Sequence, residues 1–151
     1  MRMSRGTTVM ALSMMFLGGM VGNTLCAAEP KTIAAADLAA LLKKPAAERP
    51  LIIQVGFKVM FEQAHIPGSE YIGPGDDGTG IGQLRKRVAS LKRDAAIVLY
   101  CGCCPWDRCP NVQPAAAALT AMGFTNMKVL RIPDNFGADW VAKGYPTEKA
   151  R

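Results

Sequence analysis

Four stretches of the chain place their apolar residues at helical spacing. The clearest is 81–91, where Ile81, Leu84, Val88 and Leu91 form one apolar face. Proline and glycine at the ends of such stretches mark where a helix stops. The predicted helices cover 33–44, ended by Pro45; 81–91; 112–122, ended by Gly123; and 135–143.

Three short, mostly apolar runs lie between these helices. The run AAIVLY at 95–100 is apolar on both faces, as a central parallel strand is. The runs LIIQV at 51–55 and MKVLRI at 127–132 have the length and composition of buried strands. Because strands alternate with helices, the sequence predicts an α/β fold of three layers, a mainly parallel sheet flanked by helices. Functional groups in such sheets gather at the carboxyl ends of the strands, and Cys101 directly follows the best strand.

The beginning of the chain has the three parts of a secretory signal peptide. Arg2 and Arg5 give it a basic start, an apolar run covers 10–22, and Cys26-Ala27-Ala28 offers small residues for cleavage. The apolar run is shorter than the roughly 20 residues that span a bilayer, which disfavours the alternative of an uncleaved anchor. We therefore expect a signal peptide at 1–28, a domain at 29–151, and a periplasmic or secreted protein that contacts no membrane after cleavage.

Composition places the rest of the chain among globular proteins. Of the 151 residues, 50% are hydrophobic and 20% are charged, which excludes a disordered chain. The formal net charge of +6 falls to +4 (6 − 2) when Arg2 and Arg5 are removed with the leader. The basic residues between 85 and 93 flank an apolar helix face and lack interleaved aromatic residues. We interpret them as a solvated surface and predict no nucleic-acid binding.

The segment CGCCPWDRCPN at 101–111 carries the candidate chemistry. A thiol between a strand end and a helix start lies near unpaired backbone N–H groups, which stabilise the nucleophilic thiolate over the thiol. Gly102 allows a sharp turn that aims amides inward, and Arg108 adds a positive charge for an oxyanion. Since His65 is the one histidine and lies far away in sequence, we expect Cys101 to be activated by backbone and arginine rather than by histidine.

Several motifs in a fixed order resemble a single rhodanese domain, and the resemblance covers roughly 33–147. HIPGS at 65–69 is similar to the family's His-Ile-Pro-Gly-Ala signature. The other matching features are the strand LIIQV before that signature, the strand-end Cys101, the helix AAAALTAMGF, the strand MKVLRI, Trp140 and the GYP at 144–146.

The resemblance implies a parallel five-stranded sheet and sulfur transfer through a persulfide on Cys101. No cofactor is needed, because the sulfur is carried covalently. Implied partners are a small sulfur anion or thiol and a protein sulfur acceptor. The loop after Cys101 is longer and richer in cysteine than the family pattern. The expected site comprises Cys101 as catalytic residue; Gly102, Cys103, Cys104, Trp106, Arg108 and Cys109 in the active-site loop; His65, Pro67 and Gly68 as a structural motif; and no metal.

The three additional loop cysteines have three interpretations. They are thiols that collect or exchange the sulfur, or they form a disulfide from Cys109 to Cys103 or Cys104, or they join Cys101 in binding zinc or copper. We place disulfide formation or thiol exchange first and metal second, because vicinal Cys103 and Cys104 can hardly both bind one ion without strain. The alternative to an enzyme is a non-catalytic module on the same scaffold, whose cysteine loop holds a metal, a disulfide or a partner.

Overall fold

The computed structural model describes residues 29–150, so the predicted signal peptide lies outside the described residues. Its centre is a five-stranded sheet in the order β1-β5-β4-β2-β3, with all neighbouring strands parallel. The predicted α/β fold with a mainly parallel sheet is confirmed. The strands are β1 (Thr32–Ala34), β2 (Leu51–Gln54), β3 (Glu70–Tyr71), β4 (Ile97–Tyr100) and β5 (Met127–Arg131).

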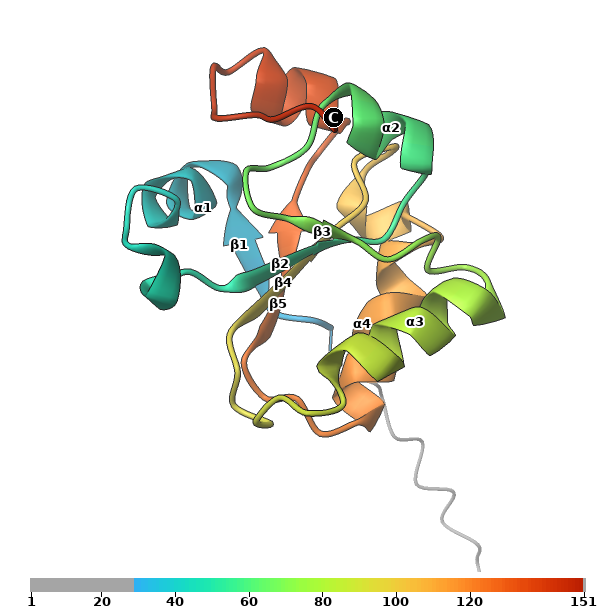
Figure 1. The fold of residues 1–151 in the computed structure, drawn as a ribbon. Helices are drawn as coiled ribbons and strands as arrows, with labels where there is room; N and C mark the ends of the chain where they lie inside the picture. The colour runs from blue at the N-terminus through green and yellow to red at the C-terminus, as the bar shows by residue number, and fades with distance from the viewer. Residues whose placement is uncertain (1–28, 151) are drawn as a thin grey trace, which may run out of the picture.

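Helices cover both faces of this sheet and complete three layers (Figure 1). The helices α3 (Gly78–Val88) and α4 (Val112–Ala121) pack on one face, where they bury Leu84 and Leu119. The other face is covered by α1 (Ala35–Leu41) and by a π-helical turn, η3 (Gly137–Val141), which buries Trp140. Three short helical segments complete the chain: α2 (Lys58–Gln63) and the 3₁₀ turns η1 (Ala46–Glu48) and η2 (Trp106–Arg108).

Strand β4 lies at the centre because both of its faces are apolar. All four of its residues are buried, and it pairs with β2 on one side and β5 on the other. Leu99 faces the core beneath α3 and α4, while Val98 faces the core beneath α1. The carboxyl end of β4 therefore opens onto the same edge of the sheet as the ends of its two neighbours, and the loop from Cys101 begins there.

The observed helices and strands differ from the predicted ones where the sequence has no clear pattern of apolar residues. The predicted helix 33–44 is split, because Thr32–Ala34 pairs with β5 before the helix starts at Ala35. The helix predicted at 81–91 begins earlier, where the Asp77 carboxylate accepts a hydrogen bond from the Gly80 N–H at 2.7 Å. Helix α2 and the two-residue β3 were not predicted from the sequence; α2 buries none of its residues, so it has no apolar period.

The HIPGS segment forms a turn that is tied to β4. The Ser69 N–H donates to the Ile66 carbonyl at 2.9 Å, and Gly68 has φ +74, the conformation that a type II turn requires after proline. The Tyr100 hydroxyl accepts from the Ile66 N–H at 3.2 Å and lies 3.1 Å from the Ser69 hydroxyl. Burial raises the pKa of Tyr100 to about 12, so this anchor stays neutral.

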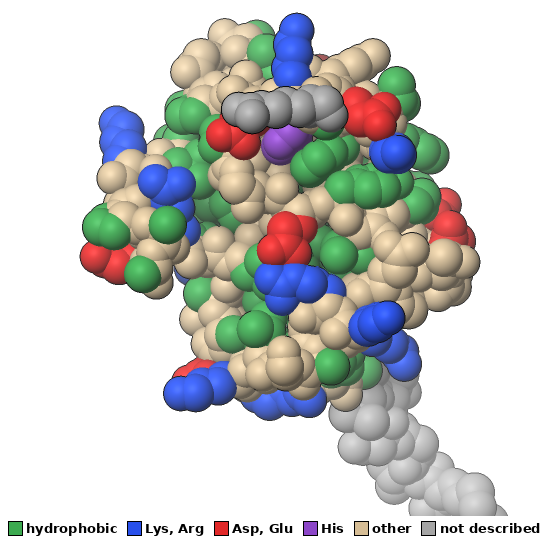
Figure 2. Space-filling view, in the orientation of Figure 1, with side chains coloured by type: hydrophobic (Ala, Val, Ile, Leu, Met, Phe, Trp, Pro, Cys, Tyr) green, Lys and Arg blue, Asp and Glu red, His purple; other side chains and the backbone are tan. Residues whose placement is uncertain are grey.

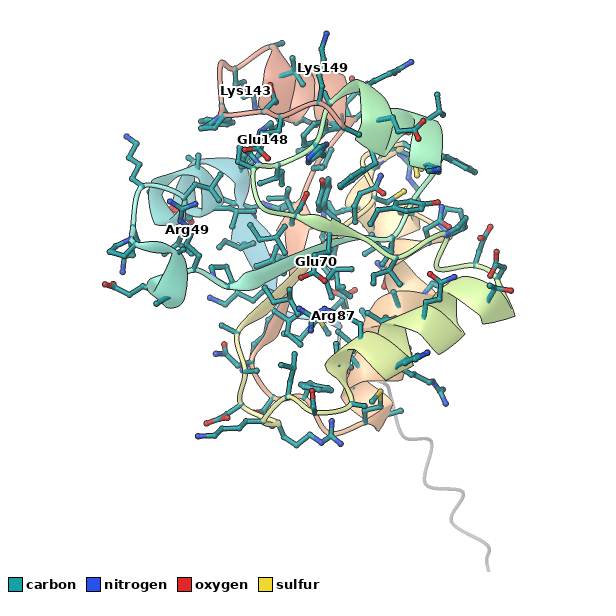
Figure 3. All side chains as sticks on the ribbon, in the orientation of Figure 1. Arg49, Glu70, Arg87, Lys143, Glu148 and Lys149 are labelled. Atoms are coloured by element: carbon teal, nitrogen blue, oxygen red, sulfur yellow. The ribbon has the colours of Figure 1, made fainter. Side chains whose placement is uncertain are left out.

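Most charged side chains lie on the outside of the fold, and Asp139, which accepts a hydrogen bond from the Asp134 N–H at 2.7 Å, is buried. The Arg87 guanidinium of α3 donates to the Glu70 carboxylate of β3 at 2.8 Å, which links the edge strand to the helix layer (Figure 3). Over the face shown in Figure 2, lysine and arginine side chains are scattered, with one beside an acidic side chain near the middle, rather than gathered in one patch. Among the described residues, no helix has both the length and the apolar character needed to cross a membrane.

Candidate functional site: a cluster of four cysteines

The loop after β4 folds back so that its cysteines gather around the strand end. Cys101 leaves β4 as a buried residue, 3% exposed, and Gly102 follows with φ +91. A side chain at Gly102 would be strained at that φ and would come within 2.7 Å of the Phe136 Cβ. The Phe136 N–H in turn donates to the Gly102 carbonyl at 2.9 Å. This sharp turn brings Cys103 back to the side of Cys101.

The four sulfur atoms form a connected cluster of free thiols. The Cys101 Sγ lies 3.2 Å from the Cys103 Sγ, which lies 3.1 Å from the Cys104 Sγ. Cys109 makes hydrogen bonds to both Cys101 and Cys104. Cys101 and Cys109 are buried, whereas Cys103 and Cys104 are half-buried. The cluster thus has an inner pair of sulfurs and an outer pair.

The surroundings of the inner pair favour the thiolate form of Cys109. The pKa of Cys109 is lowered to about 5 by the hydrogen bond from the Cys101 thiol and by the backbone N–H groups of Val112 and Asn111. These N–H groups belong to the first turn of α4, where backbone donors lack helical partners. The pKa of Cys101 is raised well above its usual range, since its thiol proton is held by Cys109 and its sulfur is buried. The first N–H groups of α4 therefore lower the pKa of Cys109, and the role of Cys101 as the nucleophile stays a prediction.

Three residues that the sequence analysis did not single out fix the position of Cys101. The buried Asn111 side chain points its amide nitrogen at the Cys101 Sγ, 3.7 Å away. The Gln54 amide donates to the Cys101 carbonyl at 3.2 Å. Gly56 leaves the space that the sulfur occupies, because a Cβ there would lie 2.7 Å from the Cys101 Sγ. The predicted sheet could have identified Gln54 and Gly56. Because β2 and β4 are parallel neighbours, residues at the end of one strand lie beside residues at the end of the other.

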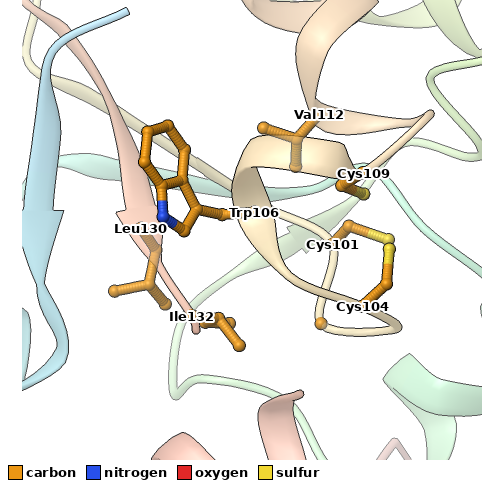
Figure 4. Close-up of a pocket in the computed structure, with 8 residues that line it drawn as sticks. Cys101, Cys104, Trp106, Cys109, Val112, Leu130 and Ile132 are labelled. Atoms are coloured by element: carbon orange, nitrogen blue, oxygen red, sulfur yellow. The ribbon is translucent and has the colours of Figure 1, made fainter. Parts of the chain in front are cut away.

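A narrow hollow, too small to hold a water molecule, lies beside the sulfur cluster and is lined by three of its four cysteines (Figure 4). Its walls are apolar apart from sulfur, and Trp106 covers one side, held by hydrogen bonds to Ile132 and Gln113. Arg108, by contrast, is exposed and does not line the hollow. The lining residues are Cys101, Gly102, Cys104, Trp106, Cys109, Val112, Leu130 and Ile132.

The residues of the predicted structural motif lie elsewhere. The His65 ring stacks on Phe61 with a centroid distance of 3.9 Å, and its Nδ1 donates to the Phe61 carbonyl at 2.8 Å. Its backbone pairs with Glu148 near the end of the chain. Pro67 and Gly68 form the turn described above. These contacts hold the segment between α2 and β3 in place.

The cluster also has the spacing of a soft-metal site. The sulfurs of Cys101, Cys103 and Cys109 all lie within 4.8 Å of one another. Thiolates of this kind are ligands for zinc or cuprous copper, and Cys104 is outside this convergent set of three. The disulfide expected between Cys109 and Cys103 or Cys104 remains a prediction, because all four residues are free thiols in the structure.

Comparison with protein families assigns the domain to a known group. The model of the rhodanese-like domain matches residues 34–131, which include β2 to β5, Cys101 and the whole cysteine loop. The chain belongs to the rhodanese-like domain family. The predicted resemblance is therefore confirmed, together with a cysteine-rich loop in the family's active-site region. A comparison with curated protein sequences finds no match.

Solved structures agree with this assignment. The BH2092 protein of Bacillus halodurans superimposes with a TM-score of 0.60 at 22% identity, covering 80% of this chain and 77% of that one. The rhodanese-like domain of the Alr3790 protein of Anabaena sp. gives 0.54 at 25% identity, covering 81% and 80%. Thiosulfate sulfurtransferase of Pseudomonas aeruginosa gives 0.56 at 24% identity, covering 80% of this chain and 20% of that longer protein.

The contact between Gly56 and the Cys101 sulfur leads to a first prediction. Gly56→Ala places a methyl group against the sulfur and against the Gln54 amide, so it should destabilise the domain by about 1–3 kcal/mol. Gly82→Ala is the matched control, because it lies on the exposed side of α3 with no atom near its Cβ and should stabilise the helix by roughly 0.5–1 kcal/mol. Urea unfolding of the two variants measures both changes. Equal stability of Gly56→Ala and wild type would contradict the contact.

Proposed function

We propose that the protein is a sulfurtransferase that carries sulfane sulfur as a persulfide on Cys101. The observation that carries this proposal is the position of the Cys101 thiol at the end of β4, 3.2 Å from the Cys103 sulfur and within 4.8 Å of the Cys109 sulfur, beside a narrow hollow. The rhodanese-like family of the chain and the likeness of its fold to a thiosulfate sulfurtransferase support it. The donor class is a small sulfur anion such as thiosulfate.

The inner pair of cysteines provides the nucleophile without histidine. The two sulfurs share one proton, and in the arrangement with this proton on Cys109 the sulfur of Cys101 is the thiolate that attacks the outer sulfur of thiosulfate. The sulfur–sulfur bond of thiosulfate breaks, and sulfite leaves with the bonding electron pair. Because the two sulfurs share one proton, the charge moves between them without a net change in the buried site. Asn111 then faces the sulfur that becomes anionic, with its amide as donor.

Transfer to the acceptor reverses these roles. A thiol, cyanide or a thiol of a partner protein attacks the outer sulfur of the persulfide, and Cys101 leaves as a thiolate. The chemistry requires no cofactor, since the sulfur stays covalently bound throughout. Because the Cys101 side chain is 3% exposed, the segment with Cys103 and Cys104 has to shift for a donor or acceptor to reach it.

We further propose that this activity takes place outside the cytosol. Support comes from the basic start, the apolar run and the small residues before Glu29 in the sequence. The remaining chain would carry a net charge of +4, which attracts small anions such as thiosulfate in a general way. A periplasmic or secreted location would also expose the loop thiols to oxidation.

The direct test is Cys101→Ser assayed for sulfite release from thiosulfate with cyanide as acceptor. We expect the rate to fall about 1,000-fold or more, because the sulfur that bonds to the transferred atom is gone. Intact mass after thiosulfate should show one added sulfur atom on the wild type and none on the variant. The far-ultraviolet circular dichroism spectrum confirms that the variant is folded. Wild-type activity in Cys101→Ser would exclude Cys101 as carrier and make Cys104 the candidate.

The ionised inner pair predicts a specific pH dependence. With the pKa of Cys109 near 5, the pair holds its negative charge above about pH 5, so the rate of persulfide formation should fall as the pH drops through that value. Cys109→Ser removes the proton acceptor, and Cys101 must then ionise alone in a buried position. The acid limb of the rate profile should move up to the ordinary thiol range of about 8.5 or higher. An unchanged acid limb in Cys109→Ser would show that Cys109 is not the base.

A further inference from the structure

We propose that Cys103 resolves the Cys101 persulfide inside the protein, releasing hydrogen sulfide and forming a Cys101–Cys103 disulfide that an external dithiol reduces. This inference rests on the proposed function, since it starts from a persulfide on Cys101. It identifies a thiol of the protein itself as the first acceptor and a dithiol reductant as the partner class. The product is sulfide rather than a sulfane sulfur passed on intact.

The structure holds these two sulfurs in position to react. The Cys101 Sγ and the Cys103 Sγ are 3.2 Å apart, and a disulfide requires them to approach by about 1 Å more. Gly102 between them has φ +91, which turns the chain so that both side chains lie on the same side. The Phe136 side chain and its N–H hold this turn in place. The folded loop already holds the two thiols together, so little further entropy is lost when they react.

The other two cysteines are less suited to this step. Cys104 contacts Cys103 at 3.1 Å and is outside the convergent set of three sulfurs around Cys101. Cys109 is 1% exposed and is held by the first N–H groups of α4, so a disulfide to it would be closed to a reductant. Cys103 is half-buried and accessible from outside.

The chemistry of the step balances within the protein. The Cys103 sulfur, after losing its proton, attacks the inner sulfur of the persulfide, which is the Cys101 Sγ that it already contacts. The bond between the inner and outer sulfur breaks, and the outer sulfur leaves with the electron pair and takes up protons as hydrogen sulfide. The two cysteines are oxidised to a disulfide, and the sulfane sulfur is reduced by two electrons. A dithiol then exchanges with the half-buried Cys103 sulfur, restores both thiols and becomes a disulfide itself.

A single-turnover experiment tests the inference on the purified domain. The protein is reduced, freed of reductant and mixed with one equivalent of thiosulfate in the absence of any acceptor. Released sulfite, released sulfide, remaining alkylatable thiols and intact mass are measured on wild type, Cys103→Ser and Cys104→Ser. The two variants are a matched pair, because each removes one half-buried thiol and leaves three loop cysteines.

We expect the wild type to release one sulfide per chain, to lose two alkylatable thiols and to yield a peptide that links Cys101 with Cys103. Cys104→Ser, whatever its rate, should still release one sulfide for each sulfite and yield the same peptide that links Cys101 with Cys103. Cys103→Ser should release sulfite but stop at the persulfide, with one sulfur atom added and sulfide release lowered at least tenfold. Dithiothreitol should restart turnover of the wild type.

Three results would overturn the inference while leaving the proposed function intact: sulfide release from Cys103→Ser at the wild-type rate, a disulfide that involves Cys104 or Cys109 instead, or a stable persulfide found on Cys103. Absence of both sulfite and added sulfur in all three proteins would instead contradict thiosulfate transfer. In that case the same measurements are repeated with inorganic polysulfide as the sulfur donor. Polysulfide forms cysteine persulfides without thiosulfate, so sulfide release and the linked peptide still test the role of Cys103.

Discussion

The first N–H groups of α4 hold the sulfur of Cys109, and the chemistry of the loop depends on this contact. They stabilise one negative charge inside a hollow whose walls are otherwise apolar. The charge keeps the proton of Cys101 between the two sulfurs, so the strand-end thiol has an internal base although histidine is absent from the cluster. The lengthened loop is what brings Cys109 to the helix start, and it thereby changes the electrostatics of the site without changing the fold.

The parallel sheet determines what can surround Cys101. Since β2 and β4 are neighbours with aligned carboxyl ends, the residues after β2 lie against the residue after β4. Gln54 binds the backbone there, and Gly56 leaves the volume that the sulfur needs. Cys103 and Cys104 are more exposed than Cys101 and Cys109, so an external thiol reaches this outer pair more easily than the buried pair.

The sequence predicted those helices and strands whose buried residues form a regular apolar pattern. The strand before Cys101 was recognisable because apolar residues occupy both of its faces, and Gly123 ended α4 as expected, with φ +83. Helix α2 could not be recognised because it buries no side chain, and β3 is only two residues held by its register with β2. The position of Cys101 directly after the central strand made it the candidate catalytic residue. The sequence did not show which of the four thiols would contact the start of α4. That depends on how an eleven-residue segment, 101–111, closes in space, which local sequence patterns do not encode.

The central claim is that one thiolate is present in the cluster near neutral pH, and it is tested most directly by titrating the ultraviolet absorbance of thiolates in the reduced, metal-free protein. We predict one thiolate per chain at pH 7 that disappears with a midpoint near pH 5, as the lowered pKa of Cys109 requires. In this pH range the ordinary thiol, with a pKa of about 8.5, contributes almost no signal. A folded protein without thiolate absorbance until pH 8 or above would contradict the account.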